Sequence, residues 1–395
     1  MLYGDGIHDD TLTLQAMLDG CGVVTVDKPG TYLISKTLIV YSNTRFILSP
    51  GAKLLASPLS RCALIENEHF AGGGRDENIE IVGGIWDGNC DQMGLDANYE
   101  TEHRLDDPYD PKLFKGKLIR FAHVDRLVLT RMTVRDPVSY GVQIADAYGF
   151  VVRDIIFDYN SHFGTTDGIH VNGPASDGVI ENLSGTTNDD LVSLTAYDEP
   201  HAEVTMGNIE NIYIHNLCGH YGYSGIRLLS GEGYHLKGIH IDGLYGSFRH
   251  HAIVIGNHNA RLGSCWYDDV VIENIYSSKA AAPLTDPACH IKWEGGFDTN
   301  AHFYFERDSV FGSLVMRNIH RHVSFETKAP LFKFNDASCS FDRFVLDNVT
   351  QTCAEGASAP LWDDNGATFK QLIERDSITE TVEKRGKSRY FAEKY

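Results

Sequence analysis

Apolar and polar positions alternate in short runs along most of this 395-residue chain. One kind of run is a short apolar strand that in most copies is followed by Asn or Asp, as in GVIENLSG (178–185) and VVIENIYS (270–277). Further copies lie at 127–134, 150–157, 212–219, 238–246, 314–321 and 344–351. Most copies are separated by roughly 23 to 34 residues, a spacing that is typical of solenoid repeats.

A second run of alternating apolar residues follows each copy, for example DGIHVNG, DLVSLTA and SGIRLLS. Aligning these runs produces two apolar columns, namely Val142, Ile169, Val192, Ile226 and Ile253, and Ile144, Val171, Leu194, Leu228 and Ile255. Because side chains alternate between the two faces of a strand, both columns point to one side. The gaps hold no helix of ten or more residues, which argues against a doubly wound α/β fold. The pattern predicts an all-β protein folded as a parallel β-helix.

The two ends of such a solenoid need caps, because each terminal coil exposes an apolar cross-section. Residues 9–21 predict an N-terminal capping helix with an Asp N-cap and an apolar face formed by Leu14, Met17, Leu18 and Cys21. The repeat pattern ends near residue 363, and residues 364–395 are predicted to form a C-terminal capping segment. Residues 89–117 are polar and rich in turn residues, which indicates a long inserted loop. We therefore interpret residues 1–395 as a single β-helix domain.

Residues between the apolar columns are predicted to point outward and to form two further columns. The first is Gln143, His170, Ser193, Arg227, Val254, Lys292 and Lys333, and the second is Ala145, Asn172, Thr195, Leu229, Gly256, Glu294 and Asn335. A purely structural face would carry mostly Thr, Ser, Asn and scattered charges. The first column instead combines a histidine, an arginine and two lysines, which indicates a binding surface.

Three aspartates flank this column, because Asp167 precedes one strand and Asp189 and Asp190 precede the next. Neighbouring coils are about 4.8 Å apart, so these carboxylates are predicted to lie roughly 5 to 9 Å from each other. Glycoside hydrolysis requires one carboxyl group that protonates the leaving oxygen and a second that acts on the other face of the sugar. Charge repulsion among clustered carboxylates raises the pKa of at least one of them, which favours a general acid near neutral pH.

The alternative interpretation is that these aspartates only form turns, since Asp side chains bond nearby backbone N–H groups. We interpret four other Asp-Gly steps in this way, namely those that begin at Asp5, Asp87, Asp177 and Asp242. Asp167 and the Asp189–Asp190 pair differ from these steps because they precede strands of the second kind on successive coils, beside the cationic column. This placement favours the catalytic interpretation.

These motifs resemble those of glycoside hydrolase family 28, the polygalacturonase-like enzymes, within the pectate-lyase-like superfamily of right-handed parallel β-helices. YGDGIHDDTLTLQ is similar to the G-D-G-x-x-D-D-T-x-A-x-Q entry of that superfamily, and IEIVGGIWDGN (79–89) is similar to a G-x-I-D-G-x-G coil. TTDGIHV and NDDLVSL resemble the family's N-T-D-G and G-D-D-C-x-A-I-K steps. The resemblance implies inverting hydrolysis by Asp167, Asp189 and Asp190, with Asp189 or Asp190 as the general acid.

The later motifs of the family are not matched. Where the family has G-H-G, this chain reads YGYSGIRLLS, with His220 four residues before Ser224. Where the family has R-I-K, the chain reads HHAIVIGNH, and Arg227 stands one coil early. In the family these cationic groups hold the uronate carboxylate, so the resemblance does not imply galacturonan as the substrate. The candidate substrate-binding residues are His170, Arg227, His251, Lys292 and Glu294.

Composition and charge restrict the partners of the chain. It holds 34 Lys and Arg against 54 Asp and Glu, and this net charge of −20 argues against nucleic acid and anionic membranes, which require a basic face. The eight cysteines form no CxxC pair, so no metal site is expected, and His250, His251 and His258 are interpreted as substrate contacts or exposed residues. No cofactor is expected. The N-terminal residues do not read as a secretory signal, which favours a cytoplasmic location and leaves a secreted mature form as the alternative.

The sequence therefore favours a glycoside hydrolase that cleaves an oligosaccharide or polysaccharide, as a monomer or a homotrimer. Two further functions remain open on the same scaffold. One is another reaction class, either a polysaccharide lyase that uses Arg227 or a lysine as its base or a fructan-type transferase. The second is a carbohydrate-binding solenoid without catalysis, as in phage or surface adhesins.

Overall fold

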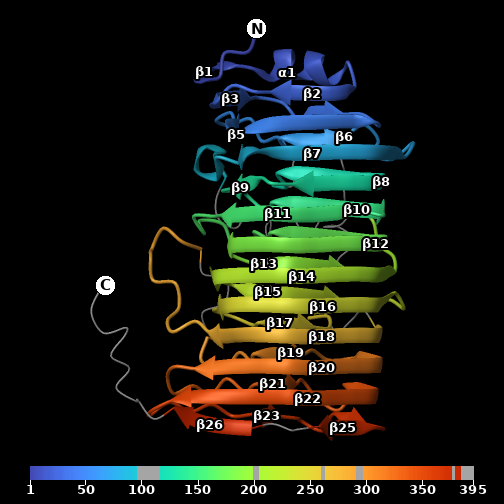
Figure 1. Cartoon of the computed structure of the whole chain (residues 1–395), viewed down its shortest axis with the longest axis vertical. Coiled ribbons are helices and arrows are strands. Elements are labelled where there is room, and N and C mark those ends of the chain that lie inside the picture. Colours follow the sequence, from blue (N-terminus) through green and yellow to red (C-terminus); the bar gives the residue numbers. More distant parts are fainter. Residues whose placement is uncertain (96–115, 199–203, 259–262, 291–296, 376–378, 384–395) are drawn as a thin grey trace.

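A computed structural model describes residues 1–95, 116–198, 204–258, 263–290, 297–375 and 379–383 of the chain. The strands stack one above another as successive coils of a parallel β-helix (Figure 1). Coils pair with their neighbours, and the strand pairs among these residues are parallel. The predicted all-β parallel solenoid is confirmed.

Short strands form one column along this stack, and they carry the apolar positions that the sequence predicted. The column contains β4 (Leu38–Val40), β6 (Ile65–Asn67), β10 (Val142–Tyr148), β13 (Asp190–Thr195), β15 (Ser224–Leu229), β17 (Ile253–Ile255), β19 (Phe303–Phe305), β21 (Phe332–Phe334), β23 (Trp362–Asp363) and the first residues of β8 (Ile119–Thr130) and β12 (Ile169–Thr186). Val142, Ile169, Val192, Ile226 and Ile253 are buried and pair in the predicted register. Because their side chains leave water on every coil, this column supplies a continuous part of the hydrophobic core.

The remaining strands wrap around the other faces of the coils. They are β1 (Asp5–Asp9), β2 (Gly22–Val26), β3 (Gly30–Ile34), β5 (Thr44–Ala56), β7 (Asp76–Asp87), β9 (Thr133–Arg135), β11 (Val151–Asp158), β14 (Ile209–Gly222), β16 (His235–Phe248), β18 (Cys265–Lys279), β20 (Ser309–Val323), β22 (Ser340–Ala354), β24 (Thr368–Phe369), β25 (Leu372–Arg375) and β26 (Thr379–Glu383). The longest of them bend from one face of the coil to the next.

The recurring asparagines of the first repeat lie at these bends. Asn182, Asn216, Asn274, Asn318 and Asn348 have φ angles between 52° and 58°, a left-handed conformation that Asn tolerates better than most residues. Their side-chain amides also bond from coil to coil: Asn216 donates to Asn182 at 2.8 Å, and Asn318 donates to Asn274 at 2.9 Å. In β12, β14, β18, β20 and β22 the repeated Asn therefore lies where the strand turns, and its amide helps to tie neighbouring coils together.

One part of the predicted outward column is wrong. Tyr304 of β19 pairs with both Val254 and Lys333, so Tyr304 occupies the position that the sequence assigned to Lys292. By the same register, Glu306 follows β19 at the position assigned to Glu294. Lys292 and Glu294 themselves lie outside the described residues.

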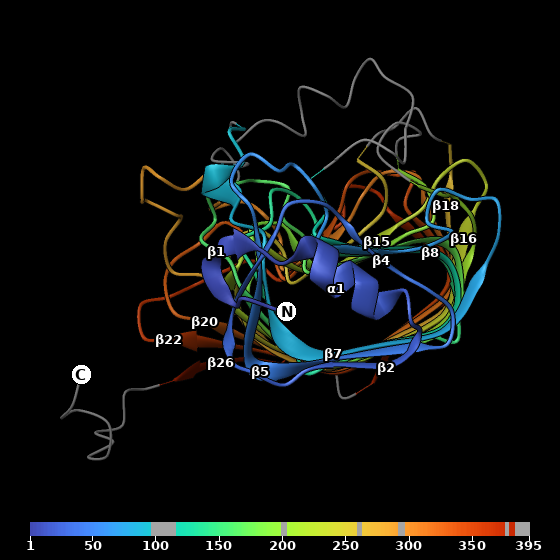
Figure 2. The same cartoon turned by 90° about the horizontal axis from the view of Figure 1, so that it is seen from above.

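The N-terminal end of the coil is covered by a short helix, α1 (Thr11–Leu18), which lies across the stack in Figure 2. Leu14 and Leu18 are buried against the first coils, as the predicted capping helix requires. The predicted range of 9–21 was too long, because Asp19 ends the helix. Cys21 is exposed in a left-handed turn and was wrongly assigned to the apolar face.

The predicted loop and C-terminal segment are only partly within the described residues. A 3-10 helix, η1 (Cys90–Gln92), begins the loop predicted at 89–117, and residues 96–115 lie outside the described ranges. After residue 363, β25 and β26 still pair with β22, so strand stacking continues beyond the predicted end of the repeat. All eight cysteines are free thiols. Among the described residues, no helix has the length and apolar character to cross a membrane.

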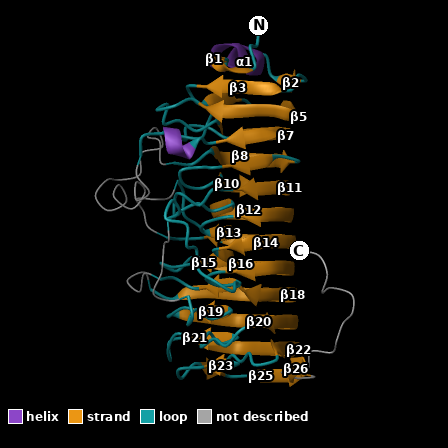
Figure 3. Ribbon diagram, turned by 90° about the vertical axis from the view of Figure 1, so that its left-hand side faces the viewer, coloured by secondary structure: helices purple, strands orange, loops and turns teal. Residues whose placement is uncertain are grey.

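Most loops gather along one side of the stack, next to the short strands β13, β15, β19 and β21 (Figure 3). Loops tolerate sequence change better than the strands they connect, so functional side chains are often placed on them. In this fold the short strands and the loops beside them together form the candidate site.

Candidate active site

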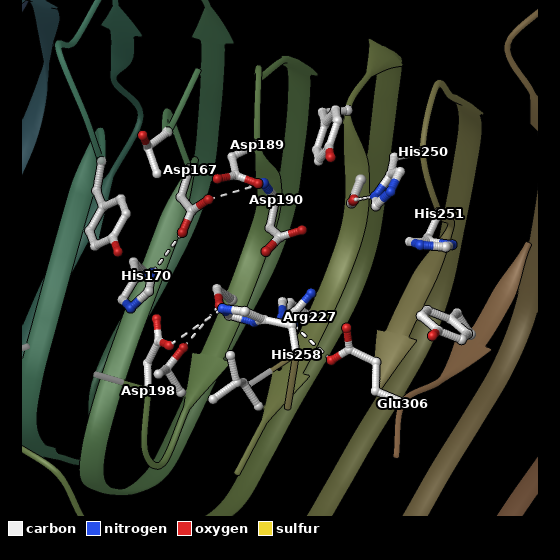
Figure 4. A pocket seen from close by; sticks show the side chains of 18 of the residues that line it. Asp167, His170, Asp189, Asp190, Asp198, Arg227, His250, His251, His258 and Glu306 are labelled. Atoms are coloured by element: carbon white, nitrogen blue, oxygen red, sulfur yellow. Dashed lines mark hydrogen bonds and ion pairs between the residues drawn. The ribbon is translucent and has the colours of Figure 1, made fainter. Parts of the chain in front are cut away.

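A pocket of about 420 Å³ lies over the short strands from β12 to β19 (Figure 4). Its described lining residues are Tyr140, Thr165, Asp167, His170, Asp189, Asp190, Ser193, Thr195, Asp198, Tyr223, Ser224, Arg227, Leu229, His250, His251, His258, Asn300, Tyr304 and Glu306. The structure thus brings together six of the eight residues proposed from the sequence. The remaining two, Lys292 and Glu294, are not among the described residues.

The three aspartates meet at one end of this pocket because their strands start on adjacent coils. Asp167 precedes β12 and Asp190 begins β13, which pairs with β12. The Asp190 backbone N–H donates to Asp167 Oδ1 at 3.0 Å, so the turn of one coil fixes the carboxylate of the other. One carboxylate oxygen from each of Asp167, Asp189 and Asp190 lies within 4.8 Å of the other two. This nearest-oxygen spacing is shorter than the predicted 5 to 9 Å.

The turn before the Asp189–Asp190 pair is held by Asn188, which the sequence interpretation missed. The Asn188 side chain is buried and donates to the carbonyls of Phe163 and His290, each at 2.8 Å. It also accepts a hydrogen bond from Arg249 at 2.6 Å. These contacts join three separated segments, so Asn188 fixes the turn from which the two acids project.

His170, three residues after Asp167 and on β12, contacts the Asp167 carboxylate. Its Nδ1 lies 2.6 Å from Asp167 Oδ2, and both side chains are buried. The imidazole stacks on Tyr140 with ring centroids 4.0 Å apart and an angle of 6° between the planes. With Oδ1 bonded to the Asp190 N–H and Oδ2 bonded to His170, the Asp167 carboxylate has a fixed orientation.

Arg227 forms a second cluster on the other side of the acids. Its guanidinium donates to Glu306 Oε2 at 2.9 Å, and it lies 2.9 Å from His258 Nδ1. Burial alone would lower the pKa of Arg227, but the carboxylates of Glu306, Asp190 and Asp198 raise it above its usual value. Arg227 is therefore a permanent cation with an anionic partner. The sequence did not reveal this partner because Glu306 is 79 residues away in the chain.

Histidine and tyrosine rings form the remaining wall of the pocket. Tyr223 stacks on His250 at 4.5 Å, and His251 stacks on Tyr304 at 5.2 Å. His251 Nδ1 donates to the Ala301 carbonyl at 2.6 Å. Burial lowers the pKa of His251 to about 3, despite that hydrogen bond, so its imidazole is neutral at physiological pH. These side chains can donate to or accept from sugar hydroxyls and can stack on sugar rings.

The buried histidines predict a loss of stability in acid. Between about pH 3 and 6.5 the unfolded state binds a proton at His251 that the folded state excludes, so stability falls as the pH falls through this range. His251 alone is expected to lower the free energy of unfolding by about 2 kcal/mol between pH 7 and pH 5. Burial also lowers the pKa of His302, which adds a loss in the same direction.

Urea unfolding at pH 7 and pH 5 measures this loss. His251→Asn retains a side-chain donor for the Ala301 carbonyl but cannot titrate, so its stability should change less between the two pH values. An unchanged pH dependence in the variant would contradict the assignment.

Among the residues that the structure describes, two groups of side chains have the spacing of metal ligands. One is the Asp167, Asp189 and Asp190 cluster, and the second is Glu68, His69 and Asp76, outside the pocket. In the second group the Asp76 carboxylate already accepts hydrogen bonds from Asn67, Ser42 and the His69 N–H. His220, which stands four residues before Ser224, is exposed and is not among the described residues that line the pocket.

Several solved structures share the fold over nearly the whole chain. The family 28 exopolygalacturonase of Yersinia enterocolitica aligns with a TM-score of 0.54 and 16% identity, covering 98% of this chain and 77% of that one. The surface adhesin PfbA of Streptococcus pneumoniae aligns with a TM-score of 0.53 and 14% identity, covering 98% and 91%. The A-module of the mannuronan C-5 epimerase AlgE4 of Azotobacter vinelandii aligns with a TM-score of 0.56 and 13% identity, covering 98% and 96%. No family model and no curated protein matches the sequence.

These alignments define the class of fold. The chain is a parallel β-helix like that of the family 28 polygalacturonases, as its motifs predicted. A hydrolase, an epimerase and an adhesin share this fold, so the choice among these functions has to come from the residues of the site.

Proposed function

We propose that this protein is a glycoside hydrolase that cleaves an oligosaccharide or polysaccharide with inversion at the anomeric carbon, on a right-handed β-helix. The cluster of Asp167, Asp189 and Asp190 carries the proposal, because it supplies three carboxylates within 4.8 Å at one end of a buried pocket. The pocket volume of about 420 Å³ lies within the range of small-molecule sites.

The spacing of the acids suits activation of a water molecule. A point between three oxygens that lie within 4.8 Å of one another is at most about 2.8 Å from each, which is within hydrogen-bonding reach. A water at that point reaches the sugar directly, without a covalent intermediate on the protein, and this favours inversion. The general relation between spacing and outcome assigns carboxyl groups about 5 to 5.5 Å apart to a retaining route. The anomer formed first is therefore a decisive measurement.

The contacts of the three carboxylates suggest different roles for them. Asp167 is proposed to orient the water, because its two oxygens are held by the Asp190 N–H and by His170. Asp190 is proposed as the general acid, since its carboxylate lies between Asp189 and the Arg227 cluster (Figure 4). Asp189 would share the water with Asp167.

Incubation with a panel of polysaccharides and p-nitrophenyl glycosides tests the proposal. We expect new reducing ends or free nitrophenol, and we expect proton NMR of the first product to show the anomer opposite to that of the substrate. Addition of a chelator should leave the rate unchanged, because no proposed step uses a metal. Binding without release of any product would support a carbohydrate-binding solenoid without catalysis and contradict the proposal.

The same experiment distinguishes a hydrolase from a lyase and from a transferase. A lyase would produce an unsaturated uronate that absorbs ultraviolet light, and a transferase would form a cyclic or rearranged sugar without consuming water. Arg227 is a poor candidate for the base of a lyase, because neighbouring carboxylates raise its pKa and so hold its proton.

A further inference from the structure

Among the described residues that line the pocket, acidic side chains outnumber Lys and Arg. Its described lining residues include five carboxylates, those of Asp167, Asp189, Asp190, Asp198 and Glu306, and Arg227 is the single Lys or Arg among them. The nearby Lys333 does not line the pocket and pairs with Asp363 at 3.7 Å. A carboxylate bound beside Arg227 would therefore meet the negative charge of the nearly buried Glu306 side chain, where repulsion is stronger than in water.

Arg227 is not available to balance a bound carboxylate, because it already has an anionic partner. Arg227 donates to Glu306 at 2.9 Å, and the side chains of the two residues are only 14% and 10% exposed. A guanidinium only donates hydrogen bonds and a carboxylate only accepts them. A sugar hydroxyl does both, so it can accept from Arg227 and donate to Glu306. A uronate carboxylate only accepts, so it would meet Glu306 without a shared proton.

The Arg227–Glu306 pair lies next to the proposed point of cleavage. Arg227 stands on β15 and pairs with Ser193 of β13, the strand that begins with Asp190, so Arg227 is displaced from Asp190 by one coil across the stack and by three residues along the strand. One coil corresponds to about 4.8 Å, which is comparable with the length of one sugar ring. Glu306 approaches Arg227 from the end of β19, two coils further along the stack. The pair therefore contacts the sugar beside the scissile bond or its immediate neighbour.

We propose that this pocket binds an uncharged sugar at the subsite formed by Arg227 and Glu306, and that it discriminates against a uronate there. The inference rests on the proposed glycosidase function for the identity of the ligand as a sugar. It differs from that function in naming the chemistry of the substrate: a sugar hydroxyl group is recognised by Arg227 and Glu306, and a carboxylate at C6 is excluded.

Binding of matched sugar pairs tests the proposal without any need for turnover. The probes are the methyl α- and β-glycosides of glucose, galactose and mannose, each paired with its uronate, which differs only in a carboxylate for the C6 hydroxymethyl group. Saturation-transfer NMR on the wild-type protein gives the dissociation constant of each member. We expect at least one neutral glycoside to bind about 10-fold or more tightly than its uronate. Added salt should reduce the difference if charge causes it.

Substitution of Glu306 tests whether its carboxylate causes the preference for the neutral sugar. Glu306→Gln removes the negative charge but keeps a hydrogen-bond acceptor. We expect it to weaken binding of the neutral sugar and to reduce the ratio of the uronate and neutral-sugar dissociation constants by about 5-fold or more. Glu273→Gln is the matched control, because Glu273 pairs with His240 at 2.6 Å and Arg317 at 2.5 Å and does not line the pocket. The control should keep the wild-type preference. An equal change for both sugars in Glu306→Gln would indicate a structural role and would contradict the proposal.

Two results would overturn the inference directly, namely equal or tighter binding of the uronates and the absence of binding to every neutral glycoside. Failure of the neutral-sugar inference is distinguishable from failure of the proposed glycosidase function. Hydrolysis of a polyuronate would preserve the function and overturn the inference, whereas neutral-sugar binding without hydrolysis of any glycan would do the opposite.

Discussion

Asp190→Asn is expected to lower kcat by about 100- to 10,000-fold, because the variant cannot donate a proton to the leaving oxygen. The amide is nearly isosteric with the carboxylic acid, and the Asp190 backbone N–H that bonds to Asp167 is retained. Folding should therefore be preserved. Initial rates on a substrate found in the glycan screen, together with the unfolding midpoint, measure the two effects separately.

Asp189→Asn is expected to cause a loss of similar order, since it weakens the hold on the attacking water. Asp177→Asn provides the control: Asp177 is exposed in a left-handed turn with φ of 56°, where Asn is well tolerated. The control should keep full activity. If Asp189→Asn and Asp190→Asn both keep full activity as well, the aspartates are turn residues and the catalytic assignment is wrong.

Phe305→Ala is expected to lower the free energy of unfolding by about 3 to 5 kcal/mol, the usual cost of removing a buried aromatic ring. Phe305 is 1% exposed, and its ring lies 4.7 Å from that of Phe334 and 5.5 Å from that of Phe341. Loss of the ring leaves a cavity that two adjoining coils share. Urea unfolding followed by circular dichroism measures the effect.

Tyr276→Ala is the matched control for this prediction. Tyr276 also stacks on an aromatic neighbour, Tyr245, at 5.9 Å, but it lies on the outer surface with 47% of its area exposed. Its removal should change stability far less, because it leaves no internal cavity. An equal decrease in the free energy of unfolding for the two variants would contradict the prediction that burial of the Phe305 ring stabilises the core.

Much of the fold could be predicted because each coil repeats the same local rule. The strands that carry the apolar column from Val142 to Ile253 alternate between apolar and outward residues. A shift of one residue in the pairing of two strands would turn the apolar residues of one strand outward, so only one register is possible. The recurring Asn was visible in the sequence, although its position at a bend within a long strand was not. Asp177 was correctly interpreted as a turn residue.

Lys292 and Glu294 were assigned wrongly because they lie where the number of residues per coil changes. β17 and β19 pair directly although Ile253 and Phe303 are 50 residues apart in the sequence, more than in the coil on either side of them. Two segments in that interval, HIKWEGG and HFYFE, both alternate as a strand does, and pattern alone cannot choose between them. The assignment of Lys292 and Glu294 to the outward columns followed the first segment, whereas the structure uses the second.

The parts of the site that were missed depend on contacts between distant segments. Asn188 looks like a turn residue in the sequence, but its amide joins Phe163, Arg249 and His290 in the structure. Glu306 likewise acquires its meaning from Arg227 on another coil. Single-sequence periodicity describes which residues face the pocket, and it contains no information on which of them touch.

The pairing of coils fixes the distances between side chains along the pocket. Asp167 and Glu306 belong to coils four steps apart, from β12 through β13, β15 and β17 to β19, so their backbones are separated by about 19 Å along the stack. Because strands add only as whole units, this length can change only by about 4.8 Å at a time. Insertion of one coil between β13 and β15 would move Arg227 away from Asp190 by about one sugar ring. Such an insertion would shift the recognised sugar along the chain while leaving both the acids and the arginine cluster intact.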